Sequence, residues 1–310
     1  MKIFAWHVHG SWMTAFVQGG HEYVVPVLAD RGPDGRGRAQ TWEWPACVIE
    51  REPPELSSLR PDFIVLQRPH EYDLAQSWLG IRPGIDVPAV YVEHNAPQGR
   101  INEMRHPMAE HPEIAVVHVT HFNALFWDCG DARTFVIEHG IVDPGARYTG
   151  ELPRCAAVIN EARRRARVTG TDLLARFDGV APVDLFGMDA APLGGIENLA
   201  QDRLHDELAR RRLYLHPIRW TSLGLSLIEA MHLAMPVVAL ATTEVPAAVP
   251  SDAGVVSTNV ETLVEASRTL LQDPKRCAAM GRRAREHALE HYGLERFLRD
   301  WDDLFEELIQ

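Results

Sequence analysis

Short, uninterrupted runs of apolar and β-branched residues recur along the 310-residue chain, with helical patterns between most of them. Such runs are typical of strands buried in a parallel sheet, whose crossover connections are helices. A first set lies at 3–8, 63–67, 88–92, 115–119 and 135–138, and a second at 156–159, 182–187, 213–216, 236–241 and 254–257. This order of elements predicts an α/β protein with parallel sheets.

A stretch rich in proline, glycine and polar residues, 144–154, separates the two sets of runs. The chain is also longer than one average domain. We therefore expect two α/β domains, at 1–150 and 151–290. Residues 31–60 contain several prolines and glycines and no clear period, and we expect them to be mostly loop with one strand at most.

The last segment, 291–310, carries Phe297, Trp301 and Phe305 four residues apart, with acids between them. This spacing places the aromatic rings on one face of a helix. We expect that face to pack on the body of the protein.

The formal net charge of −12 argues against non-specific nucleic-acid binding, which needs a surplus of lysine and arginine. Only Lys2 and Lys275 are lysines, so a site for a small anion would use arginine. The four cysteines are far apart and form no CxxC pair, which favours reduced thiols. The sequence shows neither an apolar run of membrane-spanning length nor a signal peptide, and it predicts a cytoplasmic protein with at most peripheral membrane contact.

The segment 221–238, TSLGLSLIEAMHLAMPVV, combines a glycine, a helical pattern and one acid. Its apolar residues step by three, three and four, which places them on one side of a helix: Leu225, Ile228, Met231 and Met235. The helix must end before Pro236. We expect Thr221 and Ser222 to cap its start, and Gly224 to leave the backbone there open to close approach.

A helix start with unpaired N–H groups is a natural anion site, because the amides and the helix dipole both favour negative charge. Glu229 lies one turn further along, beside the apolar stripe, where an acid needs a partner. A nucleoside diphosphate sugar would meet both needs: the amides of Gly224, Leu225 and Ser226 would bind its diphosphate, and Glu229 its ribose hydroxyls. The alternative is a structural ion pair between Glu229 and an arginine.

The run HPIRWTSLGLSLIEAMHLAMPVVALATTEVPAAVPSDAGVVS resembles the donor-binding segment of retaining GT-B glycosyltransferases related to glycogen synthase and phosphatidylinositol mannosyltransferase. The matching positions are Pro217, Gly224, Glu229, Pro236 and Glu244. The tail from 270 to 301 and the segment VYVEHNAP also resemble this family. The resemblance implies two Rossmann-like, doubly wound domains that face each other across a cleft, with the acceptor in the first and the donor in the second. It also implies that the terminal helix packs back on the first domain.

The resemblance further implies transfer of a hexose-type sugar from a nucleoside diphosphate sugar to an acceptor hydroxyl, with retention at the anomeric carbon. No metal or other cofactor is expected, because arginine and helix-start amides can carry the charge of the leaving diphosphate. The acceptor can be a carbohydrate, a lipid-linked molecule or a small molecule.

By the same resemblance, His94 faces the donor sugar, and Thr221 stands where the family has a sugar-binding glutamate. Thr169-Gly170 replaces a lysine-glycine pair whose lysine binds the diphosphate. Arg164 matches the family's phosphate arginine, although an arginine run is also typical of a solvated helix face. His94 and Thr221 are thus the candidate catalytic residues.

Four further residues are candidates. Arg219 is a second candidate for the diphosphate, Glu244 either binds a sugar hydroxyl or caps a helix, and Gly10 and Ser11 form a loop for the acceptor or a phosphate. We interpret His139 as structural. Loss of the glutamate and the lysine leaves two alternatives open: a catalytically degenerate sugar-nucleotide-binding partner protein, and a nucleotide-sugar epimerase.

Overall fold

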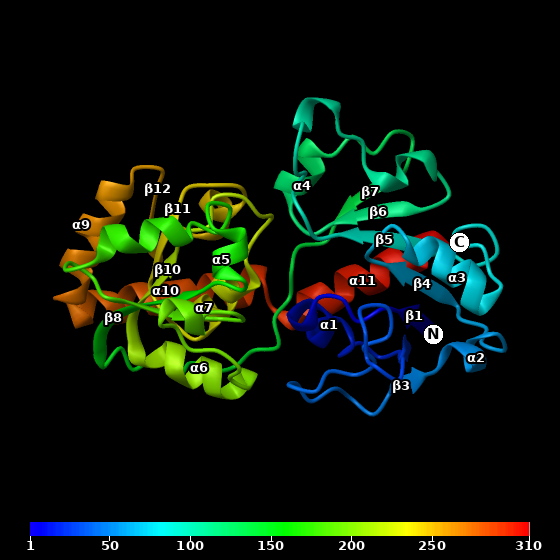
Figure 1. The fold of residues 1–310 in the computed structure, drawn as a ribbon, viewed down its shortest axis with the longest axis horizontal. Coiled ribbons are helices and arrows are strands. Elements are labelled where there is room, and N and C mark those ends of the chain that lie inside the picture. Colours follow the sequence, from blue (N-terminus) through cyan, green and yellow to red (C-terminus); the bar gives the residue numbers. More distant parts are fainter. Residues whose placement is uncertain (310) are drawn as a thin grey trace. The chain divides into compact units, whose positions relative to one another are not determined.

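Two parallel sheets organise the chain, which is described from residue 1 to residue 309 in a computed structural model (Figure 1). Each sheet forms the centre of one compact unit. Unit 1 comprises Met1–Val142 together with the segment that starts at Leu294, and unit 2 comprises Asp143–Gly293.

The boundary between the units lies before the expected position at residue 150. Tyr148 and Thr149 already belong to unit 2, because their backbone N–H groups donate to the carbonyls of Leu233 and Ala209. At the other end, the last helix belongs to unit 1 from Leu294 onward rather than from residue 291.

Unit 1 contains seven parallel strands in the order β3-β2-β1-β4-β5-β6-β7. They are β1 (Lys2–Ala5), β2 (Glu22–Pro26), β3 (Val48–Arg51), β4 (Phe63–Leu66), β5 (Ala89–Glu93), β6 (Ala115–His118) and β7 (Thr134–Val136). The strand order reverses between β1 and β4, which defines a doubly wound, Rossmann-like sheet. The runs identified in the sequence did not include β2.

The helices of unit 1 are α1 (Gly10–Phe16), α2 (Pro53–Leu56), α3 (Glu71–Leu79), α4 (His121–Phe126) and α11 (Leu294–Ile309), with 3-10 turns η1 (Ile101–Glu103) and η2 (Pro107–Glu110). Figure 1 shows α11, in red, beside α1. The ring of Trp301 lies 5.8 Å from that of Trp12 and 5.0 Å from that of Phe16. Phe305 packs on Phe63 with a centroid distance of 4.7 Å. The aromatic face of α11 is therefore part of the core of unit 1.

Unit 2 contains five parallel strands in the order β12-β11-β10-β8-β9. They are β8 (Leu152–Val158), β9 (Val183–Phe186), β10 (Arg211–His216), β11 (Val237–Leu240) and β12 (Gly254–Ser257). The strand order reverses between β8 and β10, so this sheet is doubly wound as well.

The helices of unit 2 are α5 (Ala162–Arg165), α6 (Gln201–Arg210), α7 (Leu225–His232), α8 (Val245–Ala248), α9 (Val260–Leu271) and α10 (Pro274–His291), with 3-10 turns η3 (Thr171–Phe177) and η4 (Ala191–Leu193). Helix α9 packs on β8, β10, β11 and β12, whereas α6 and α7 contact each other and β10. Within residues 1–309, no helix combines the length and the apolar character needed to cross a bilayer.

Helix α7 starts at Leu225, and its N-cap is Gly224 with no side-chain hydrogen bond. The expected capping by Thr221 and Ser222 is therefore wrong, because the helix begins too far downstream for either side chain to occupy the N-cap position. The helix ends at His232, ahead of Pro236.

Candidate functional site

The point of strand reversal in unit 2 lies between β8 and β10, and ligands of doubly wound proteins bind outside the carboxyl ends of the strands at such a point. Gly170 lies where the loop after β8 packs against the residues that follow β10. Its φ is +70°, and a Cβ on it would stand only 2.7 Å from the carbonyl carbon of Pro217 and closer still to the oxygen. The backbone N–H groups of Arg219 and Trp220 both donate to the carbonyl of Val168. The loop after β8 is thus packed directly on the segment that leads into α7.

Two side chains of β10 contact the start of α7. The Tyr214 hydroxyl donates to Ser226 Oγ at 2.8 Å. The ring of His216 lies against Gly224, where a Cβ would be 2.6 Å from His216 Cε1. Gly224, Leu225 and Ser226 remain partly exposed, so the first amides of the helix can be approached.

Glu229 is buried on α7, with 5 % of its surface exposed. Gln201 Nε2 donates to Glu229 Oε2 at 3.0 Å, and His205 Nε2 lies 3.5 Å from the same oxygen. Both partners come from α6, one helical turn apart. The sequence analysis did not identify these two residues, and their i, i+4 spacing on a predicted helix was the one signal they carried.

The two candidate arginines are both engaged in ion pairs. Arg164 Nε lies 2.8 Å from the Glu161 carboxylate, and its side chain is 69 % exposed. Arg219 binds the Asp172 carboxylate through both terminal nitrogens, at 2.5 and 2.9 Å, which lowers the pKa of that carboxyl. Arg165 forms no ion pair with any of residues 1–309, is half-buried, and has a pKa lowered by that burial. Arg165 is therefore the arginine of this run that is free to meet an anion.

The remaining candidates of unit 2 lie in the loops after β8, β10 and β11. Thr169 is buried, and its hydroxyl donates to the carbonyl of Ala166 at 3.2 Å and lies 3.0 Å from the hydroxyl of Thr171. Thr221 is partly exposed. Glu244 is buried at the N-cap position of α8 but makes no side-chain capping bond.

In unit 1 the strand order reverses between β1 and β4, and His94 lies just after β5, the next strand of the sheet. Gln67 Nε2 donates to the carbonyl of Trp6 at 2.6 Å, which leaves Gln67 Oε1 to accept from His94 Nε2 at 3.0 Å. The ring of His9 lies 4.1 Å from that of His94. Burial lowers the pKa of His94 well below its usual range, with smaller contributions from neighbouring histidines, so the ring is neutral at pH 7.

Gly10 and Ser11 form the first turn of α1. The space beside Gly10 is filled by an indole ring, since a Cβ there would stand 2.7 Å from Trp42 Cη2. The sequence analysis expected an acceptor or phosphate at this loop and did not identify Trp42, which lies in the segment 31–60. His139 is buried in the same unit, and neither ring nitrogen has a hydrogen-bond partner among residues 1–309.

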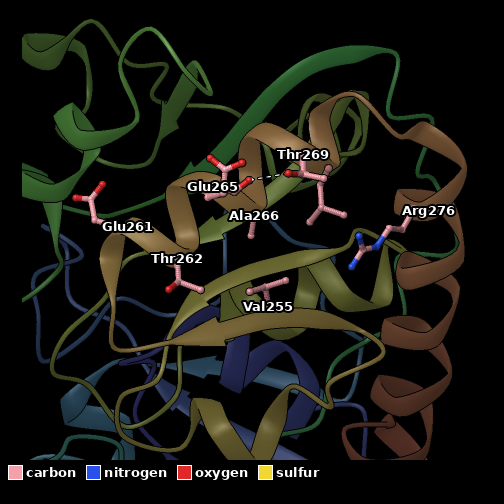
Figure 2. A pocket seen from close by; sticks show the side chains of 8 residues that line it. Val255, Glu261, Thr262, Glu265, Ala266, Thr269 and Arg276 are labelled. Atoms are coloured by element: carbon pink, nitrogen blue, oxygen red, sulfur yellow. Dashed lines mark hydrogen bonds between the residues drawn. The ribbon is translucent and has the colours of Figure 1, made fainter.

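An open groove lies elsewhere in unit 2, between α9, the edge strand β12 and the start of α10 (Figure 2). Its lining includes Glu261, Glu265 and Arg276. Two strands separate β12 from the reversal point beside β8, counting β11 and β10. The groove is therefore distinct from the region around α7 that carries the predicted residues.

Comparisons with known proteins bear on this arrangement. Residues 196–287, from the segment before α6 to α10, match the family model described as glycosyl transferases group 1. A comparison with curated proteins finds no match to the sequence.

Solved structures share the fold over most or nearly all of this chain. Sucrose-phosphate synthase from Thermosynechococcus elongatus aligns over 99 % of both chains, with a TM-score of 0.71 and 13 % identity. HepE from Anabaena, in complex with UDP, aligns over 99 % of this chain and 100 % of its own, with a TM-score of 0.70 and 14 % identity. TarM of S. aureus, in complex with UDP, aligns over 78 % of this chain, with a TM-score of 0.63 and 16 % identity. The chain covers 55 % of that TarM chain.

Two parallel-sheet units of this kind make up the GT-B fold, which the chain shares with these structures, and the match of residues 196–287 supports a glycosyltransferase enzyme. More particularly, residues 196–287 of its second unit are similar to the glycosyl transferases group 1 family. The narrower likeness to glycogen synthase and phosphatidylinositol mannosyltransferase stays a prediction.

Proposed function

We propose that the protein transfers a hexose-type sugar from a nucleoside diphosphate sugar to an acceptor hydroxyl, with retention at the anomeric carbon. Unit 2 binds the donor: the amides at the start of α7 hold the diphosphate, and Glu229 accepts hydrogen bonds from the ribose hydroxyls. The structures of HepE and TarM, which share the fold, are complexes with UDP, which supports a nucleotide as the ligand.

The observation that carries the proposal is the position of Glu229. Its carboxylate is buried one turn inside a helix that starts at the strand reversal of the sheet, and the neutral amide of Gln201 orients it. The ion pairs of Arg164 and Arg219 are with Glu161 and Asp172. A ribose hydroxyl at the α7 start can donate to this carboxylate beside its contacts with Gln201 and His205.

The transfer step needs positioning more than a nucleophile. In the proposed mechanism the acceptor hydroxyl attacks from the face that the diphosphate leaves, and the leaving phosphate takes the hydroxyl proton. His94 binds the donor sugar as a neutral imidazole, because its Nε2 proton is directed to Gln67 and its pKa is lowered by burial. Thr221 contributes a hydroxyl at the place of the family's glutamate.

We propose that no metal and no other cofactor take part. The charge of the leaving diphosphate is carried by the α7 amides and by an arginine. Arg165 is better suited to this than Arg164 or Arg219, because the latter two are already neutralised by Glu161 and Asp172. The acceptor, a carbohydrate, a lipid-linked molecule or a small molecule, binds to unit 1 near Gly10 and Ser11, and Glu244 contacts a sugar hydroxyl.

One observation favours the rival, a degenerate nucleotide-sugar-binding protein. The hydroxyl of Thr169, at the position of the family's lysine, is engaged within its own loop by Ala166 and Thr171 and supplies no charge. The rival predicts nucleotide binding without any turnover of the sugar. An epimerase, in contrast, would convert the donor with no acceptor present.

The experiment is calorimetric titration of the protein with UDP, GDP and ADP, followed by turnover assays with the matching sugars. Glu229→Ala should weaken binding of the preferred nucleotide by about 1.5–3 kcal/mol, roughly 10- to 150-fold, the usual loss for a charged hydrogen bond. Glu229→Gln keeps the volume and removes the charge, which separates the two effects.

Glu265→Gln is the matched control, because Glu265 lies in the groove at the β12 edge and pairs with Arg268 on its own helix. This variant should bind nucleotide like the wild type. Unchanged affinity in both Glu229 variants would refute the proposed role of the carboxylate.

A further inference from the structure

His216 is a buried polar side chain with no role in the function proposed above. It is the last residue of β10, and 1 % of its surface is exposed. Neither Nδ1 nor Nε2 has a hydrogen-bond partner among residues 1–309. A buried donor left without a partner costs about 1–3 kcal/mol. Such a group is unusual and calls for a physical reason.

The alternation of side chains along β10 directs His216 towards α7. Leu213 and Leu215 belong to the core cluster that includes residues of α9. Tyr214 and His216 point to the other side, with rings 6.2 Å apart and nearly parallel, and Tyr214 bonds Ser226 in the first turn of α7. His216 reaches the same turn at Gly224.

Gly224, the N-cap of α7, lies against the imidazole and has no side chain. A Cβ at this position would stand 2.6 Å from His216 Cε1 and 3.3 Å from Nε2. No side chain of Gly224 therefore separates the imidazole from an anion bound to the first amides of α7.

The charge state of the ring suits an anion. Burial lowers the pKa of His216 to about 4, so at pH 7 the imidazole is neutral and carries one N–H donor and one lone pair. Phosphate oxygens only accept hydrogen bonds. A neutral imidazole can thus donate to a diphosphate without placing a second positive charge beside the positive end of the helix dipole.

From this geometry we propose that the imidazole N–H of His216 donates a hydrogen bond to the diphosphate bound at the start of α7. The inference rests on the proposed function, since it assigns a further contact to the same donor site. With this contact, the helix amides and an imidazole, all neutral donors, supply much of the hydrogen bonding to the phosphates.

Histidine-selective ¹⁵N NMR of the full chain tests this directly. The ring-nitrogen signal of His216, assigned by its loss in His216→Gln, should shift when UDP is added and should not shift with uridine, which lacks the phosphates. His232 is the matched internal control, because it is buried at the other end of α7 and its Nδ1 already bonds the carbonyl of Ile228 at 2.9 Å. Its signal should stay in place.

Calorimetry gives an independent readout. His216→Phe should lower UDP affinity by about tenfold or more, whereas His232→Phe should leave it within about twofold, a difference that general loosening of α7 would not produce.

If the wild type binds none of UDP, GDP and ADP, the proposed function fails and this inference fails with it. If it binds UDP and Glu229→Ala weakens binding, but the His216 signal does not move or moves equally with uridine, only this inference is refuted. The NMR result on the wild type decides even if His216→Phe does not fold.

Discussion

Gly170 offers the sharpest test of how the donor region is assembled. Its φ of +70° is left-handed, and a Cβ would overlap the carbonyl of Pro217, the residue after β10. Gly179 has nearly the same φ, +74°, but a Cβ there would meet nothing within 4 Å. Substituting each by alanine therefore separates backbone strain from steric overlap, within one unit of the protein.

The strain is common to both variants and costs about 1–2 kcal/mol. Overlap with a backbone carbonyl that cannot rotate away adds the cost of overpacking, about 1–3 kcal/mol, to Gly170→Ala alone. For a domain of this size each kcal/mol lowers Tm by roughly 2–4 °C. Gly170→Ala should thus melt roughly 2–12 °C below Gly179→Ala.

Differential scanning fluorimetry of the two variants and the wild type measures this difference. Nucleotide affinity should fall along with stability only in Gly170→Ala, because only that residue joins the loop after β8 to the segment leading into α7. Equal melting temperatures for the two variants would show that the close approach of Gly170 and Pro217 does not exist in solution.

Two further predictions concern pH and metal ions. Burial lowers the pKa of His139 to about 3, below its value in the unfolded chain. Its contribution to stability is therefore complete above pH 6.5 and is lost as the pH falls towards 3. Urea titrations between pH 4 and 6 give the unfolding free energy as a function of pH, and His139→Gln should make this plot shallower by up to about 1.4 kcal/mol per pH unit; an unchanged slope would mean that the ring is not buried as a neutral group. EDTA should leave sugar transfer unchanged in a donor-turnover assay, because the diphosphate charge is assigned to amides and arginine; activity lost with EDTA and restored by Mg²⁺ or Mn²⁺ would contradict this.

Much of the fold follows from local sequence patterns. Most strands are continuous apolar runs, and these indicate a buried parallel sheet whatever the surroundings. Strand β2 was not predicted because its run ends in Pro26, a residue that argues against a strand. The start of α7 was placed too early because Thr221 and Ser222 are good capping residues, whereas the helix has Gly224 as its N-cap.

The site was only partly predictable. Glu229 stands out in the sequence because an acid in an apolar helix needs a partner. Its partners, Gln201 and His205, come from another helix, and only the packing of α6 on α7 brings them together. The same holds for Arg219, whose pairing with Asp172 depends on the loop after β8.

The path of the chain also bears on how the protein matures. The aromatic rings that close the core of unit 1 come from α11, which follows all of unit 2. On the ribosome, the first 142 residues emerge early but keep an apolar surface uncovered until α11 has been synthesised. Their assembly must therefore wait for translation of the second unit, and a nascent chain stalled before residue 294 should present Phe16 and Trp12 to chaperones.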